Sequence, residues 1–116
     1  MNPSEFCVVI CNTPGSDIAT QLAEALLDRQ LAACVNIFPP VRSIYRWEGK
    51  IEQAEEVPLL IKTRVDQYAA VQDCLTDLHP YTVPEIIALP LNAGLPAYLG
   101  WVQDNIKPAP LDGDKE

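Results

Sequence analysis

The chain has 116 residues, 48% of them hydrophobic and 21% charged, which is typical of a single soluble globular domain. Its formal net charge of −8 argues against a nucleic-acid partner, because phosphate backbones are bound by Lys and Arg. The apolar run at residues 6–11 is too short for a signal sequence or a membrane span, so we expect a cytoplasmic protein with no membrane partner. In that reducing compartment we expect no structural disulfide among the four cysteines Cys7, Cys11, Cys34 and Cys74.

The first part of the chain predicts a strand, a helix and a long interrupted strand. Residues 6–12 are a β-branched run closed by the turn-like NTPGS, which indicates a buried strand. Ser16 or Asp17 can cap the following segment, where the spacing of apolar residues predicts a helix over 17–30. Residues 33–47 are rich in β-formers but contain two consecutive prolines, so we expect a second strand with a bend or bulge.

The second part of the chain predicts a hairpin, a helix, a strand and a short helix. After a turn in WEGK, residues 58–63 return as a third strand and complete a long hairpin. Apolar residues at intervals of three and four predict a second helix over 66–78, which Pro80 ends. Residues 84–90 form the fourth strand, and a third, shorter helix follows within 94–106.

This order of elements predicts the fold class. Strand, helix, strand, strand, helix, strand, followed by a C-terminal helix, is an α+β arrangement of the ferredoxin-like split βαβ type. Both main helices are expected on one face of an antiparallel sheet. We assign residues 1–106 to a single domain, and residues 107–116, which are polar and rich in proline, to a disordered acidic tail.

The predicted sheet leaves apolar surface that the chain cannot cover. Its second face carries as many apolar residues as the first, and no further element remains to pack on it. The long hairpin, with Tyr45 and Trp47 near its tip, is expected to project and to pair with a neighbouring copy. We therefore predict a closed homo-oligomer. A ring of three suits a prism of three sheets, and a dimer is the alternative.

The chain's single histidine, His79, is the main candidate for chemistry. No nucleophile elbow, phosphate-binding glycine loop or HExxH motif is present, so we expect a protein that is not an enzyme and has no catalytic residues. In the predicted topology Cys11, at the end of the first strand, and His79, at the end of the second helix, lie at the same end of the sheet.

Two interpretations of Cys11 and His79 stay open from these residues. A thiolate and an imidazole suit copper or zinc, with a third ligand from Asn12, a backbone group, a carboxylate or a neighbouring subunit. Alternatively, Cys11 is a small buried hydrophobe and His79 is a structural ring at a helix end.

Four stretches resemble the CutA divalent-cation tolerance proteins: LAACVNIFPPVRSIYRWEGKIE, LLIKT, HPYTVPEIIALPL and YLGWV, in matching order across about residues 6–105. The resemblance implies ferredoxin-like subunits that form a homotrimer through the long hairpin, and a role in tolerance to copper and other divalent cations. It also implies Cys11 and His79 as metal ligands. Some relatives have two adjacent histidines before PY, whereas this chain has Leu78 there, so one implied ligand is missing.

The leading hypothesis is a cytoplasmic homotrimer that binds copper, or another divalent cation such as zinc, and takes part in the response to metal ions. The alternative is a PII-like trimeric sensor of small ligands or a protein-interaction module, since the expected architecture resembles PII-type signalling proteins. The chain lacks their long flexible loop and a cluster of basic residues for phosphate. The expected partners are further copies of the chain and metal ions, with no nucleic acid.

Overall fold

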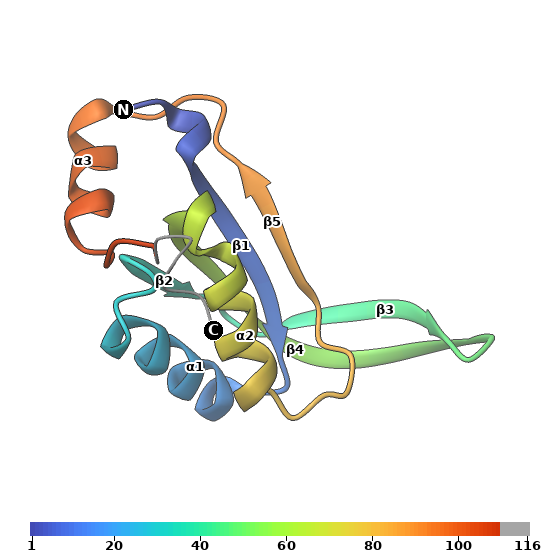
Figure 1. Cartoon of the computed structure of the whole chain (residues 1–116). Helices are drawn as coiled ribbons and strands as arrows, with labels where there is room; N and C mark the ends of the chain where they lie inside the picture. Colours follow the sequence, from blue (N-terminus) through green and yellow to red (C-terminus); the bar gives the residue numbers. More distant parts are fainter. Residues whose placement is uncertain (110–116) are drawn as a thin grey trace.

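The computed structural model describes residues 1–109, and residues 110–116 of the predicted tail lie outside the described part. Figure 1 shows the arrangement of the elements. Short 3₁₀ turns, η1 (Pro3–Glu5) and η2 (Val65–Gln67), precede β1 and α2. The strands and helices are β1 (Phe6–Thr13), α1 (Ser16–Asp28), β2 (Cys34–Ile37), β3 (Val41–Trp47), β4 (Lys50–Arg64), α2 (Tyr68–Leu78), β5 (Ile86–Pro90) and α3 (Pro96–Asp104).

The sheet has the strand order β2-β4-β1-β5, and each pair of neighbours is antiparallel. Helices α1 and α2 pack on the same face, as Figure 1 shows. Because each helix connects strands that are not adjacent in the sheet, the chain forms two interleaved βαβ units. The predicted ferredoxin-like split βαβ fold is confirmed.

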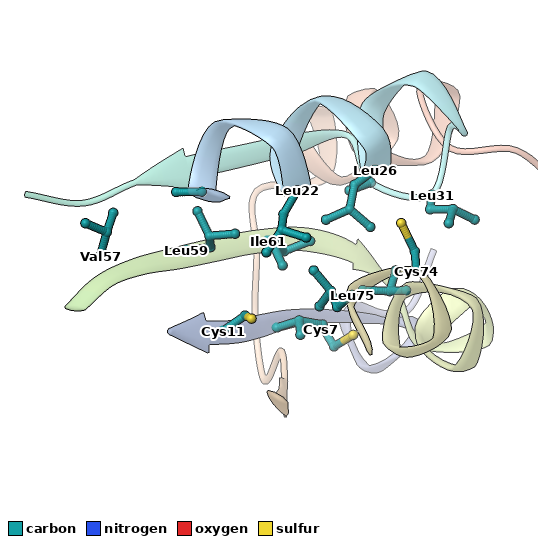
Figure 2. Packing of buried hydrophobic residues seen from close by; sticks show 14 residues of the cluster. Cys7, Cys11, Leu22, Leu26, Leu31, Val57, Leu59, Ile61, Cys74 and Leu75 are labelled. Atoms are coloured by element: carbon teal, nitrogen blue, oxygen red, sulfur yellow. The ribbon is translucent and has the colours of Figure 1, made fainter. Parts of the chain in front are cut away.

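The core lies between the helices and the two central strands. Alternate residues of β1 and β4 are buried against the helices, which is the period of two that a half-covered strand requires. The helices contribute residues at intervals of three and four, as an amphipathic helix does. Figure 2 shows this packing, which includes Cys7, Cys11, Leu59 and Ile61 from the strands and Leu22, Leu26, Cys74 and Leu75 from the helices.

The third strand is longer than predicted. We expected residues 58–63, whereas β4 begins at Lys50 and runs for 15 residues. Its first half, which contains the polar QAEEV, pairs with β3 in a register that places Val41 opposite Glu56. The low strand propensity of these polar residues is overridden because both faces of the ribbon are largely exposed and the backbone ladder is complete.

The two prolines separate the ribbon from the sheet. Strand β2 ends at Ile37 and β3 begins at Val41, so the predicted interruption of the second strand is confirmed. Beyond it, β3 and the first half of β4 project from the domain as a two-stranded ribbon (Figure 1). Glu48 and Gly49 form its tip with φ of 50° and 79°, which is the left-handed geometry of a type I′ turn and matches the strand twist.

The helix ends differ in detail from the predictions. Helix α1 has Gly15 at its N-cap without a side-chain hydrogen bond, so the predicted cap by Ser16 or Asp17 is wrong. Gly15 is extended there, and Ser16 already belongs to the helix. At the other end α1 stops at Asp28, because Gln30 adopts a φ of 56° that a helix does not allow.

Helix α3 packs at the end of the domain opposite the ribbon tip (Figure 1). It forms a small second cluster with Phe6 and Ile106. Lys107, the first residue of the predicted tail, is held by two hydrogen bonds: its amide donates to the Gln30 carbonyl at 2.9 Å, and its carbonyl accepts from Gln67 Nε2 at 2.8 Å. No described helix is long and apolar enough to cross a membrane.

Candidate functional site

Cys11 lies near the end of β1, on the face that the helices cover, and is completely buried. Burial raises the pKa of the Cys11 thiol to about 12, and the negative charges of Glu85 and Glu56 act in the same direction. Its Sγ atom lies 3.8 Å from the carbonyl oxygen of Asn12 and donates to it. At neutral pH the side chain is therefore a protonated thiol.

His79 occupies the C-cap of α2. Its backbone amide donates to the Leu75 carbonyl at 2.8 Å, and its φ and ψ of −76° and 135° are extended, because the following Pro80 disfavours the helical region. The imidazole packs against the ring of Tyr81, with centroids 4.7 Å apart, and His79 is only 7% exposed. The proline that ends the helix thus turns this ring toward the end of β1.

Both ring nitrogens of His79 have backbone partners. Nε2 lies 2.7 Å from the carbonyl oxygen of Asn12, and Nδ1 accepts from the amide of Tyr81 at 3.1 Å. A carbonyl can only accept and a backbone amide can only donate, so the ring is the neutral tautomer with its hydrogen on Nε2. The imidazole links the end of the helix to the end of the strand.

The structure therefore brings Cys11 and His79 together at one atom, the carbonyl oxygen of Asn12. In this closed state, neither side chain offers a free lone pair or a thiolate to a metal ion. Within residues 1–109, no group of three or more His, Cys, Asp and Glu side chains is placed to hold one. The pair, as folded, is a helix-end cap and does not fit a ready-made metal centre.

Leu78 is the last residue of α2 and directly precedes His79. It is 41% exposed and does not belong to the core. The helix ends at this residue, so its side chain is no longer flanked by a following turn.

A cavity of about 520 Å³ lies next to Asn12, and no pattern in the sequence predicts it. Its walls are the end of β1, the ribbon of β3 and β4, and the connection between α2 and β5. Glu85 of that connection accepts a hydrogen bond from Asn12 Nδ2 at 3.2 Å, which ties two of the walls together.

The fold and this site define a ferredoxin-like α+β protein with a projecting ribbon and a thiol–imidazole pair at one end of the sheet. A model of the CutA1 divalent ion tolerance protein family matches residues 7–105, and the chain belongs to this family. The resemblance found in the sequence is thus confirmed.

Individual relatives agree with this assignment. The divalent-cation tolerance protein CutA of Thermus thermophilus is 44% identical over 98 residues, which is 84% of this chain and 95% of the relative. The CutA homolog of Xenopus laevis is 46% identical over 91 residues, 78% of this chain, and the match spans 60% of that longer protein. The solved structure of the periplasmic divalent cation tolerance protein CutA of Archaeoglobus fulgidus superposes with a TM-score of 0.85 at 39% identity, covering 88% of this chain and 99% of that one.

Proposed function

We propose that this protein contributes to divalent-cation tolerance by binding copper, or another divalent cation such as zinc, as its cargo through Cys11 and His79. The observation that carries the proposal is the meeting of these two side chains at the Asn12 carbonyl. A thiolate and an imidazole together favour the softer divalent ions, and copper stands at the top of the affinity series. The protein acts by binding and not by catalysis.

Binding has to open the closed arrangement. The ion replaces the proton of Cys11. If Nδ1 of His79 binds the ion, the ring gives up the Tyr81 amide and keeps its hydrogen bond to Asn12; if Nε2 binds it, the ring hydrogen moves to Nδ1 and both backbone partners are given up. The Tyr81 amide is released if the connection that carries Tyr81 and Glu85 moves away from His79. Glu85, which already contacts Asn12, is a carboxylate that could serve as a third ligand.

We further propose that the working form is a homotrimer. Supporting this, the face of the sheet opposite the helices has an apolar row, with Ile10 paired to Ile87 and Val8 paired to Leu89. Leu89 is 52% exposed in the single chain. Exposed apolar rows of this kind mark interfaces, and burial contributes about 25 cal/mol for each Å² removed from water.

We also propose that the protein works in the cytoplasm. All four cysteines are free thiols, which agrees with a reducing compartment. Because the relative from Archaeoglobus fulgidus is described as periplasmic, cell fractionation with antibody detection is the appropriate test.

The metal proposal is tested by calorimetric titration of the purified oligomer with copper. We expect saturable binding that weakens in Cys11→Ala and in His79→Ala and disappears in the double variant. Cys34→Ala is the matched control, because it removes a half-buried thiol on β2, away from the Asn12 carbonyl. Unchanged affinity and stoichiometry in the double variant would show that copper binds elsewhere.

A further inference from the structure

The cavity beside Asn12 has a lining most of which the metal proposal does not use. Tyr45, Trp47 and Glu56 of the ribbon form one side, and Tyr81 and Glu85 of the connection after α2 form another. Its volume of about 520 Å³ lies in the range of pockets that hold small organic ligands. Neither Cys11 nor His79 belongs to the lining.

The strand register explains why these ribbon side chains share one wall. Residues paired across an antiparallel ladder point to the same face, and β3 pairs Val41 with Glu56 and Tyr45 with Glu52. Since side chains alternate along each strand, Trp47 lies on this face too.

The opposite face of the ribbon carries a different set. There, Ile44 pairs with Gln53 and Ile51 pairs with Arg46, and both isoleucines are exposed. The face turned away from the cavity thus also offers apolar side chains to a neighbouring copy. A copy that pairs through Ile44 and Ile51 would leave the aromatic wall free for a ligand.

The lining is negatively charged. Among the described residues that line the cavity there are two carboxylates, those of Glu56 and Glu85, and no Lys or Arg. Their influence extends to neighbouring groups: burial and the charge of Glu56 raise the pKa of Tyr81, and both carboxylates help to raise the pKa of Cys11. These charges therefore disfavour an anionic ligand and attract a cation.

Three aromatic rings stand beside these two charges. The faces of Tyr and Trp rings attract a desolvated organic cation, and Trp is the strongest of the aromatic side chains in this respect. A strongly hydrated inorganic ion gains little from such rings. We infer that this cavity binds a small organic ammonium ion, either an amine or a quaternary ammonium compound, between the rings of Tyr45, Trp47 and Tyr81 and the carboxylates of Glu56 and Glu85.

The test uses the full-length protein in its native oligomeric state. Choline and tetramethylammonium are titrated by calorimetry, with tryptophan fluorescence as a second readout of Trp47. We expect saturable binding of both probes. The neutral isostere of choline, 3,3-dimethylbutan-1-ol, should bind about tenfold more weakly or not at all, because it keeps the shape and loses the charge.

Three variants locate the site. Glu56→Gln and Trp47→Leu should each weaken choline about tenfold. Glu55→Gln is the matched control, since it removes the same charge one residue away on the opposite face, and it should leave affinity within about twofold. Light scattering and thermal melting establish that each variant keeps its assembly and fold. If Glu56→Gln fails this check, Glu85→Gln replaces it.

The inference is overturned if neither ammonium probe binds saturably. This result is expected if a side chain of a neighbouring subunit fills the cavity. Equal binding of the neutral alcohol, or an equal effect of Glu55→Gln and Glu56→Gln, also overturns it, because attraction would then be unspecific. These outcomes are separate from the copper titration, which depends on Cys11 and His79.

Discussion

The Nε2 atom of His79 lies 2.7 Å from the carbonyl oxygen of Asn12, and this contact joins the end of α2 to the end of β1 across 67 positions of the sequence. The same carbonyl oxygen accepts from the Cys11 thiol, so both candidate ligands donate a hydrogen bond to one backbone oxygen. Any change of protonation, metal loading or side chain at this point alters how the helix end is attached to the sheet.

Replacing His79 by alanine should lower the free energy of unfolding by about 1–3 kcal/mol, because the nearly buried contacts to Asn12 and Tyr81 lose their partner. Denaturant unfolding followed by circular dichroism measures this loss. Leu78→Ala is the control, since Leu78 is the preceding residue and is exposed. This variant should lose much less free energy of unfolding than His79→Ala. Equal losses in both variants would contradict a structural role for the imidazole.

Stability should fall in alkaline solution because of Cys11. In the unfolded chain a thiol loses its proton near its ordinary pKa of 9.0, while burial keeps the pKa of Cys11 at about 12 in the folded state. Between these values the folded state binds more protons than the unfolded state, so the free energy of unfolding decreases as pH rises. Below pH 9 the Cys11 thiol makes its full contribution to the free energy of unfolding. Above pH 9 this contribution decreases by up to about 1.4 kcal/mol per pH unit.

Cys11→Ala isolates this effect. The variant loses stability at every pH through the cavity it leaves, but its unfolding free energy should depend less steeply on pH between 9 and 11 than that of the wild type. Cys7 and Cys74, whose pKa values burial also raises, are present in both proteins and cancel in the comparison. Parallel slopes would show that the Cys11 thiol does not titrate as described.

Metal affinity should rise with pH if Cys11 is a ligand. Between pH 6 and 8 each bound ion displaces the thiol proton, so the association constant should increase about tenfold per pH unit. Zinc is the suitable probe, because it has no redox chemistry with thiols. Competition with a chromophoric chelator measures the constant, and Cys11→Ala should show a markedly flatter dependence. An equally steep dependence in the variant would assign the proton to another group.

Leu89→Glu should dissociate the oligomer, because it places a charge in the apolar row of the uncovered sheet face. Leu27→Glu is closely matched: Leu27 is 44% exposed, compared with 52% for Leu89, but lies on α1, on the helical side of the sheet. Light scattering should show a smaller species for the first variant only. Dissociation by both variants, or by neither, would place the interface elsewhere.

The sequence predicted the fold because its signals are local and mutually consistent. The apolar periods around Leu22 and Leu75 and the stop at Pro80 each depend on neighbouring residues alone, and together they leave one topology. That topology also placed Cys11 and His79 at the same end of the sheet. Their shared hydrogen-bond acceptor was not predictable, since it depends on the orientation of one carbonyl group.

The cavity escaped prediction for a different reason. Its walls come from three segments far apart in the sequence, and they meet only because the ribbon lies over the connection that carries Tyr81. The polar stretch before Val57 shows no strand signal, so the sequence did not reveal the register that puts Tyr45 and Glu56 on the same face of the ribbon. Had the third strand been predicted to begin before residue 58, the alternation of side chains would have placed these residues on one face.

Strand β4 passes without a break from the ribbon into the sheet, with Val57 as its first deeply buried residue. Before that point its backbone is paired with β3 alone, and an isolated two-stranded ladder is marginally stable in water. Amide hydrogen exchange along this single strand should therefore change abruptly near Val57 in a dissociated chain and become uniformly slow when neighbouring copies are in place. Hydrogen exchange in the half of β4 after Val57 would thus report whether the domain is folded, and exchange in the half before Val57 would report whether the subunits are associated.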